Sequence, residues 1–88
     1  MIVPVELFAA AAAALGRTTD QLELPSSAVL GDLMDALEAQ AASTADPANA
    51  AAVLARCTYL VEGVATTDRD APLTAGSAVD VLPPFSGG

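Results

Sequence analysis

The chain has 88 residues, 53% of them hydrophobic, with eleven Asp or Glu against three Lys or Arg, which gives a formal net charge of −8. A chain of this length forms one small domain with one core, and its acidity disfavours nucleic acid and anionic membrane surfaces as partners. It has no histidine and a single cysteine. A zinc site, a Ser–His or Cys–His catalytic pair and an internal disulfide are therefore not expected. The acidity either favours basic protein surfaces or only keeps an alanine-rich chain in solution.

The single cysteine and the length of the longest apolar run indicate the cellular compartment in which the protein is expected. One cysteine fits a reducing compartment, and no basic segment followed by a long apolar run indicates a secretory signal. The apolar run FAAAAAAL at residues 8–15 is far too short to span a bilayer. We expect a cytoplasmic protein that binds no metal, no nucleic acid and no membrane.

The first quarter of the chain predicts a strand, a short helix and a second strand. Residues 2–8 alternate in the manner of a half-buried strand, although Pro4 removes one donor and must lie where its missing N–H faces outward or at a bulge. The alanine run at residues 9–15 favours a helix that Gly16 ends. Residues 19–25 alternate weakly and predict a second strand paired with the first as a hairpin.

A longer helix follows, with Ser26 or Ser27 as its expected N-cap. Its apolar positions repeat with helical spacing, and they are Val29, Leu30, Leu33, Met34, Leu37 and Ala41. The intervening Asp32, Asp35 and Glu38 form an acidic run that is either a solvated face or a partner contact.

The second half of the chain alternates short elements with turns. Pro47 breaks the helix, and residues 50–56 form one or two further helical turns. Residues 57–63 predict a strand ended by a glycine, residues 66–72 predict a loop, and residues 78–82 predict a last strand ended by two prolines. Strands packed on one principal helix predict an α+β domain with two layers.

The C-terminal third contains a series of short motifs: Val61-Glu62-Gly63, Pro72-Leu73, Gly76-Ser77, the strand from Val79 to Leu82, Pro83-Pro84 and the final Gly87-Gly88. This series resembles the ubiquitin-like sulfur carriers, most closely the small subunit of molybdopterin synthase (MoaD type), with the thiazole-pathway carriers (ThiS type) as cousins. In the N-terminal half, Phe8-Ala9, Leu15-Gly16 and Leu30-Gly31-Asp32-Leu33 also look familial. Glu62 stands where this family usually has asparagine, Ser77 where it usually has aspartate, and Pro4 lies inside the first strand.

The resemblance implies a ubiquitin-like β-grasp fold, with a mixed sheet packed on one main helix over residues 1–82 and a flexible tail at residues 83–88. It also implies a chemistry for the tail. An ATP-dependent adenylating and sulfurating enzyme activates the Gly88 carboxylate, which becomes a thiocarboxylate. A sulfurtransferase supplies the sulfur, and the large subunit of molybdopterin synthase receives it. The chain itself binds no cofactor, because the partner handles ATP and Mg²⁺.

The tail sequence suits insertion into a narrow partner site. Bare glycines at its tip allow close approach, and prolines at its base limit the entropy lost on ordering. Strand alternation turns several apolar side chains outward beside the tail. The expected partner-binding residues are Phe8, Leu60, Leu82, Pro84, Phe85, Ser86 and Gly87. Cys57 is expected to be a buried apolar thiol rather than a reactive one.

Three other functions remain open on the sequence. A carrier could serve thiazole or cysteine synthesis instead. The chain could be a ubiquitin-like modifier joined to target lysines, although the lack of lysine excludes attachment to another copy of itself. It could also be an acidic binding module whose tail is inert.

Overall fold

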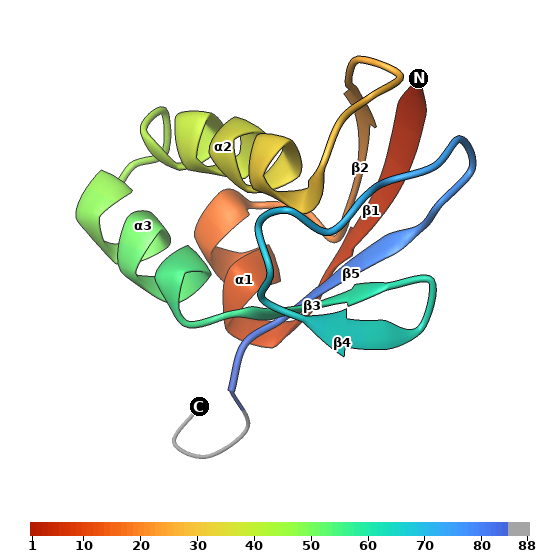
Figure 1. Cartoon of the computed structure of the whole chain (residues 1–88). Coiled ribbons are helices and arrows are strands. Elements are labelled where there is room, and N and C mark those ends of the chain that lie inside the picture. The colour runs from red at the N-terminus through yellow and green to blue at the C-terminus, as the bar shows by residue number, and fades with distance from the viewer. Residues whose placement is uncertain (85–88) are drawn as a thin grey trace.

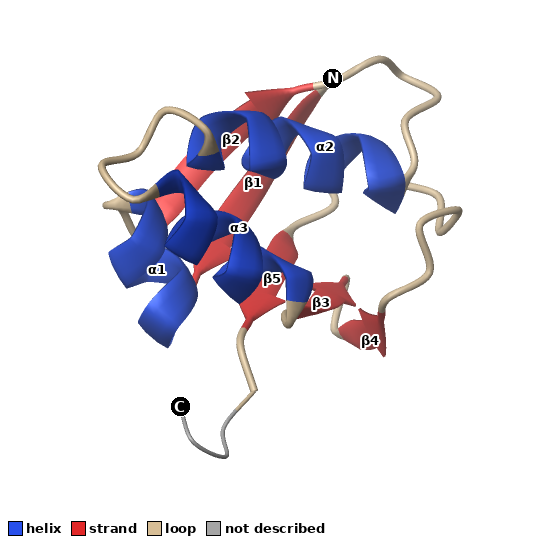
Figure 2. Ribbon diagram, turned by 90° about the vertical axis from the view of Figure 1, so that its left-hand side faces the viewer, coloured by secondary structure: helices blue, strands red, loops and turns tan. Residues whose placement is uncertain are grey.

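The structure, a computed structural model, describes residues 1–84, so the predicted tail beyond Pro84 lies outside the described residues. Five strands form one sheet in the order β2-β1-β5-β3-β4, and the three helices lie on one side of it (Figures 1 and 2). The central pair β1–β5 is parallel and the other pairs are antiparallel. The elements are β1 (Ile2–Leu7), α1 (Ala9–Leu15), β2 (Thr19–Glu23), α2 (Leu30–Ala41), α3 (Pro47–Ala55), β3 (Thr58–Val61), β4 (Val64–Thr66) and β5 (Val79–Leu82).

The core lies between the sheet and the helices. Alternate residues of the strands point inward, as the period of two requires. On the central strands these are Val3, Val5, Leu7, Tyr59, Val79 and Val81. From α2, the apolar stripe buries Leu30, Leu33 and Leu37 completely. The predicted α+β class with a ubiquitin-like mixed sheet is confirmed, with α2 as the main helix and the shorter α1 and α3 packed against each other beside it.

Pro4 fits in the middle of the sheet because of where β5 begins. The Leu7 N–H donates to Thr18 in the β2 direction, and the Phe8 N–H donates to Val81 of β5. The N–H groups of even-numbered β1 residues therefore face β5. Pairing with β5 starts at Val5, so the donor that Pro4 lacks would have no partner strand at that position.

The start of α2 differs from the prediction. Neither Ser26 nor Ser27 caps the helix, which begins at Leu30 with Val29 at the N-cap position. The Asp32 carboxylate accepts from the Val29 N–H at 2.9 Å. A distant loop supplies the remaining acceptors: the Leu30 N–H donates to the Ala71 carbonyl and the Gly31 N–H to the Arg69 carbonyl, each at 2.8 Å. A helix terminus needs such acceptors, and here tertiary structure provides them.

Gly31 allows that loop to approach. A Cβ at this position would lie 3.1 Å from the Arg69 carbonyl oxygen and 3.3 Å from the Arg69 Cβ. The Arg69 guanidinium then folds over the helix, donating to the Gly31 carbonyl at 3.2 Å and to Asp35 Oδ1 at 2.6 Å. The loop before β5 is thereby fastened to the first turn of α2.

Pro47 starts a helix rather than only ending one. It occupies the first turn of α3, where its missing N–H has no intrahelical partner in any case. Asp46 is the N-cap, and its side chain accepts from the Asn49 N–H at 3.2 Å. The predicted helical turns at residues 50–56 are therefore the later part of a longer helix.

The predicted loop at residues 66–72 begins after a strand that the sequence analysis missed. Residues Val64–Thr66 form β4, which pairs with β3 through a two-residue turn at Glu62 and Gly63. Both turn residues have positive φ, 50° and 81°, as a tight hairpin of this kind requires. The Ser77 hydroxyl donates to Glu62 Oε1 at 3.2 Å, so two of the positions that depart from the family pattern contact each other.

Candidate functional site

The outer face of the sheet carries apolar side chains where the tail begins. Leu82 lies opposite Thr58, and Leu60 lies opposite Asp80 and Ala65. Leu60 and Leu82 are thus diagonal neighbours on one face. Both side chains are half-buried, whereas the neighbouring Val61 and Val81 side chains point to the helix side. The structure brings these two predicted contact residues together.

Phe8 completes this group at the end of β1. Its backbone is extended and its N–H donates to the Val81 carbonyl at 3.2 Å, so the parallel register continues and places Phe8 beside Leu82. The Phe8 side chain is 38% exposed. Ala9, the next residue, has φ 48°, a conformation that costs an L-residue about 1–2 kcal/mol. This sharp turn sends the chain into α1 directly after Phe8.

The tail leaves the domain beside this apolar group. Because β1 and β5 are parallel, the end of β5 lies next to the end of β1, and the chain emerges there (Figure 1). Pro83 is half-buried and Pro84 is exposed. Together with Ala10, Val53 and Arg56 they line a small cavity of about 40 Å³. The base of the tail is therefore held against α1 and α3.

Four of the predicted site residues cannot be placed in this way. Phe85, Ser86, Gly87 and Gly88 lie outside the described residues, so their roles stay predictions. The group formed by Phe8, Leu60, Leu82 and Pro84, called here the tail-base patch, is the part of the predicted site that the structure describes.

Two acidic residues on the same face were not singled out from the sequence. Glu6 of β1 and Asp80 of β5 are register partners in the centre of the sheet. Glu6 is exposed and Asp80 is half-buried beside Leu60. The signal that could have found them is the alternation itself, since both lie between inward-facing residues of their strands.

Two acids of the α2 run, Asp32 and Asp35, make contacts within the domain rather than forming only a solvated face or a partner contact. Asp32 caps the helix, and Asp35 pairs with Arg69. The hydrogen bond and the charge of Asp35 raise the pKa of Arg69 further above its ordinary value. Two of the three predicted surface acids thus stabilise the loop and the helix start.

Cys57 is a buried thiol, as expected. Its side chain is 6% exposed, and its Sγ donates to the Val53 carbonyl at 3.2 Å. Burial raises the pKa of this thiol, so the reactive thiolate is disfavoured. The neighbouring Tyr59 has its pKa raised to about 12, mainly by burial and then by the charges of Cys57 and Glu38. Both side chains are therefore in their protonated, unreactive forms near neutral pH.

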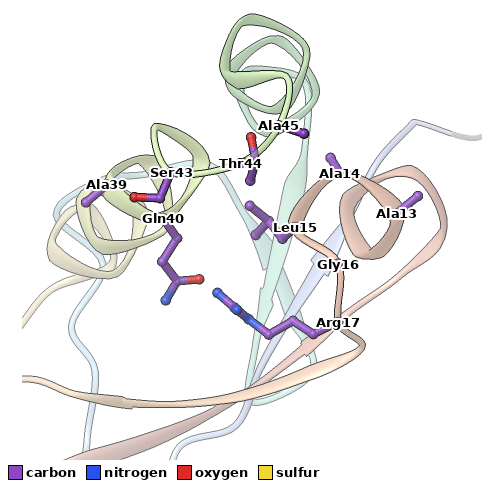
Figure 3. Close-up of a pocket in the computed structure, with 10 residues that line it drawn as sticks. All are labelled: Ala13, Ala14, Leu15, Gly16, Arg17, Ala39, Gln40, Ser43, Thr44 and Ala45. Carbon is purple, nitrogen blue, oxygen red and sulfur yellow. The ribbon is translucent and has the colours of Figure 1, made fainter.

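A cleft of about 650 Å³ lies elsewhere, between α1 and the C-terminal end of α2 (Figure 3). Its lining combines four alanines with Leu15, Gly16 and the polar residues Arg17, Gln40, Ser43 and Thr44. Arg17 and Gln40 point toward one another in it (Figure 3), and both contact Asp20, at 3.3 Å and 2.8 Å. The described residues that line it include no pair of nucleophile and base.

Among residues 1–84, no three His, Cys, Asp or Glu side chains gather in a way that could hold a metal ion. Within the same range, every helix is too short or too polar to cross a lipid bilayer.

Comparison with known proteins decides the family. The profile of the ThiS family matches residues 5–88, which is nearly the whole chain. The chain belongs to the ThiS family. No curated protein sequence matches it, so the remaining comparisons are structural.

Solved structures share the fold of this ThiS-family chain over most or all of their length. SAMP1 from Haloferax volcanii is 27% identical, with 100% of both chains covered and a TM-score of 0.78. A second Haloferax volcanii protein, solved in solution, is 26% identical, with 100% of this chain and 87% of that chain covered and a TM-score of 0.76. A chain from the complex of subunits 1 and 2 of the molybdopterin-converting factor of Helicobacter pylori is 19% identical, with 100% of both covered and a TM-score of 0.70.

Proposed function

We propose that this chain is a sulfur carrier, the small subunit of a molybdopterin synthase, with Gly88 as the residue that carries sulfur. The observation that carries the proposal is the match of the ThiS family through residue 88, across the Gly87-Gly88 pair. The tail-base patch supports it, because it offers a docking surface where the tail leaves the domain. The protein acts in the cytoplasm in this proposal, where its single cysteine stays reduced.

The chemistry requires activation of a poor electrophile. A partner enzyme binds ATP and Mg²⁺, and the Gly88 carboxylate attacks the α-phosphate to form an acyl adenylate with release of pyrophosphate. Sulfur at the sulfide level, delivered by a sulfurtransferase, then displaces AMP and leaves a thiocarboxylate. The chain contributes no acid, base or metal ligand to these steps. It contributes position, since two small residues at the tip present the acyl group without obstruction.

The folded domain fixes the position of the base of the tail. Pro83 and Pro84 fix φ at the base of the tail, and they lie across a small cavity from Ala10 of α1 and Val53 of α3. Ordering each further residue costs about 1–2 kcal/mol of backbone entropy. A firmly held base keeps that cost to the few residues that enter the partner.

The proposed recipient is the large subunit of molybdopterin synthase, which would dock on the tail-base patch and take the sulfur for a pterin precursor. The solved complex of subunits 1 and 2 of the molybdopterin-converting factor supports this choice through its shared fold. Transfer to thiazole or cysteine synthesis remains the alternative recipient for the same carrier chemistry.

A second candidate function is attachment to other proteins. It is favoured by the likeness to a small archaeal modifier protein. In that case the same acyl adenylate is attacked by a target lysine, which forms an amide and releases AMP. Conjugates that survive reducing denaturation would support this function, because an amide persists where a thioester or disulfide does not.

The decisive experiment is intact-mass measurement of the chain after incubation with ATP, a sulfur source and the cognate adenylating enzyme. We expect a mass gain equal to the replacement of one oxygen by sulfur, located in the final peptide. A chain extended by one residue after Gly88 is the matched control and stays unmodified. A mass gain in the extended chain, or none in the natural one, contradicts the carrier proposal. Adding the pterin precursor and the large subunit then tests the recipient.

A further inference from the structure

The small cavity at the tail base lies directly where the described part of the chain ends. Ala10 of α1 and Val53 of α3 line it together with Pro83 and Pro84, so most of its surface is apolar. Its volume is about 40 Å³, whereas a cavity that binds benzene measures about 150 Å³. An aromatic side chain can therefore cover this cavity from outside but cannot enter it fully.

One cation lines the same cavity. Arg56 directly follows α3, is exposed, and takes part in no ion pair among residues 1–84. The other two arginines of the chain are engaged, Arg17 with Asp20 and Arg69 with Asp35. An arginine beside an apolar cavity suits a ligand that combines an apolar group with a carboxylate, because the guanidinium matches a carboxylate in charge and shape.

The chain itself carries such a ligand next to the cavity. Phe85 follows Pro84, which already lines the cavity, so an aromatic side chain is tethered to the edge of the site. Gly88 ends the tail with a carboxylate in the proposed function. The four residues after Pro84 span at most about 14 Å, and Ser86 and Gly87 suit a turn that brings the carboxylate back. The tether also gives the tail a high effective concentration at the cavity.

We propose that the tail docks on its own domain in the free chain, with the Phe85 ring over the cavity between α1 and α3 and the Gly88 carboxylate accepting from the Arg56 guanidinium. This inference rests on the proposed carrier function for its carboxylate, and it adds a resting position for the tail. Leu60 and Leu82 lie on the outer sheet face, so a docked tail leaves that surface open to a partner. The acyl group is withheld from activation until the tail is released.

Nuclear magnetic resonance of the natural chain without partners tests the contact. We expect nuclear Overhauser effects between the Phe85 ring protons and the methyl groups of Ala10 and Val53. A mixture of isotope-labelled and unlabelled chains separates contacts within one chain from contacts between two copies. The proposal is overturned if the ring shows no such contacts, or if it shows them only between copies.

Two glutamine variants with the same change in charge test the ion pair. Arg56→Gln removes the cation at the cavity, whereas Arg17→Gln removes one from the cleft between α1 and α2. The amide heteronuclear Overhauser effect of Gly88 reports how firmly the tail is held. We expect it to fall in the Arg56→Gln variant and at high salt, and to persist in Arg17→Gln and largely in Arg56→Lys. Equal losses in the two glutamine variants mean that net charge holds the tail, and they overturn the ion pair.

The rate of sulfur gain tests whether docking withholds the acyl group. At limiting adenylating enzyme, we expect Arg56→Gln to gain sulfur about two- to fivefold faster than the natural chain, because more of its tails are released. A rate equal to that of the natural chain overturns the withholding.

The two proposals can fail separately. A natural chain that gains sulfur without any ring contacts contradicts the docked tail and leaves the carrier function standing. Ring contacts in a chain that never gains sulfur support the docked tail and contradict the carrier function.

Discussion

The two faces of the sheet differ in what covers them. The helix side is filled by fully buried side chains such as Val3, Val79 and Leu33. The three helices lie on that side alone (Figures 1 and 2), and the other side carries the half-buried Leu60 and Leu82 and a pair of acids. The same five strands therefore bury one face in the core and leave the other open, and the proposed function assigns partner binding to the open face. A substitution on the covered face should reduce the stability of the fold, whereas one on the open face should reduce partner binding.

The largest expected effect is on the covered face. Leu33→Ala removes a completely buried side chain from α2, and such changes cost about 2–5 kcal/mol through lost burial and the cavity left behind. Denaturant titration measures the free energy of unfolding. The control is Leu60→Ala on the outer face, for which we expect a loss below about 1 kcal/mol. Similar losses at both positions would show that the two faces are not distinct.

Next in size is an effect on the open face. Leu60→Lys places a cation beside Asp80, so the fold should keep its stability within about 1 kcal/mol. Binding to the adenylating enzyme should weaken roughly tenfold or more, because a charge replaces the apolar contact of the tail-base patch. Affinity is measured by calorimetry, with Leu60→Met as the control that keeps apolar volume. Unfolding of the lysine variant would mean that Leu60 belongs to the core.

A smaller effect on stability is expected at Ser77, which lies in the loop before β5 and bonds to Glu62 in the β3–β4 turn. Ser77 is 1% exposed, accepts from the Thr74 N–H at 3.2 Å and donates to Glu62 at 3.2 Å. Removing its hydroxyl should cost about 1–2 kcal/mol, since each such bond contributes roughly 0.5–1.5 kcal/mol. A double-mutant cycle of Ser77→Ala with Glu62→Ala isolates the shared bond. Additive losses would show that the two side chains do not interact in solution.

The smallest effect appears only at alkaline pH. The pKa of Tyr59 is raised from 10.0 to about 12 in the folded state. The unfolded chain then loses its proton first as pH rises, so stability is full below about pH 10 and falls between pH 10 and 12. Thermal unfolding over this range measures how steeply stability falls with pH, and Tyr59→Phe should make that fall shallower. Some fall in stability with pH remains in the variant, because burial also raises the pKa of Cys57. An unchanged slope in the phenylalanine variant would contradict the burial of the hydroxyl.

The sequence predicts most of the covered face. Strand alternation in residues 2–8 and 78–82 and the helical spacing of the α2 leucines placed the core residues correctly, because these patterns depend only on which side of an element is buried. The two-layer class followed from their order. The family followed from motifs at the end of the chain rather than from the core.

What sequence reasoning missed depends on distant partners or on local turn geometry. The carbonyls of Arg69 and Ala71 accept from the first N–H groups of α2. A local sequence pattern cannot predict a hydrogen-bond partner that far along the chain. The β3–β4 hairpin was missed because Glu62 is an unusual residue for a turn position with positive φ, although the glycine after it was a usable signal. The pairing of Glu6 with Asp80 required the register of two strands at opposite ends of the chain.

That register has a consequence for how the protein is made. The parallel pair at the centre of the sheet joins Val5 to Val79, so β1 gains this neighbour only after more than 70 further residues have been synthesised. A truncated translation product lacks β5, leaves β1 and β3 with open edges, and exposes the apolar side chains meant for the core. Such fragments are targets for proteases and chaperones. The residues after β5 are therefore displayed on a folded body only once β5 has joined the sheet.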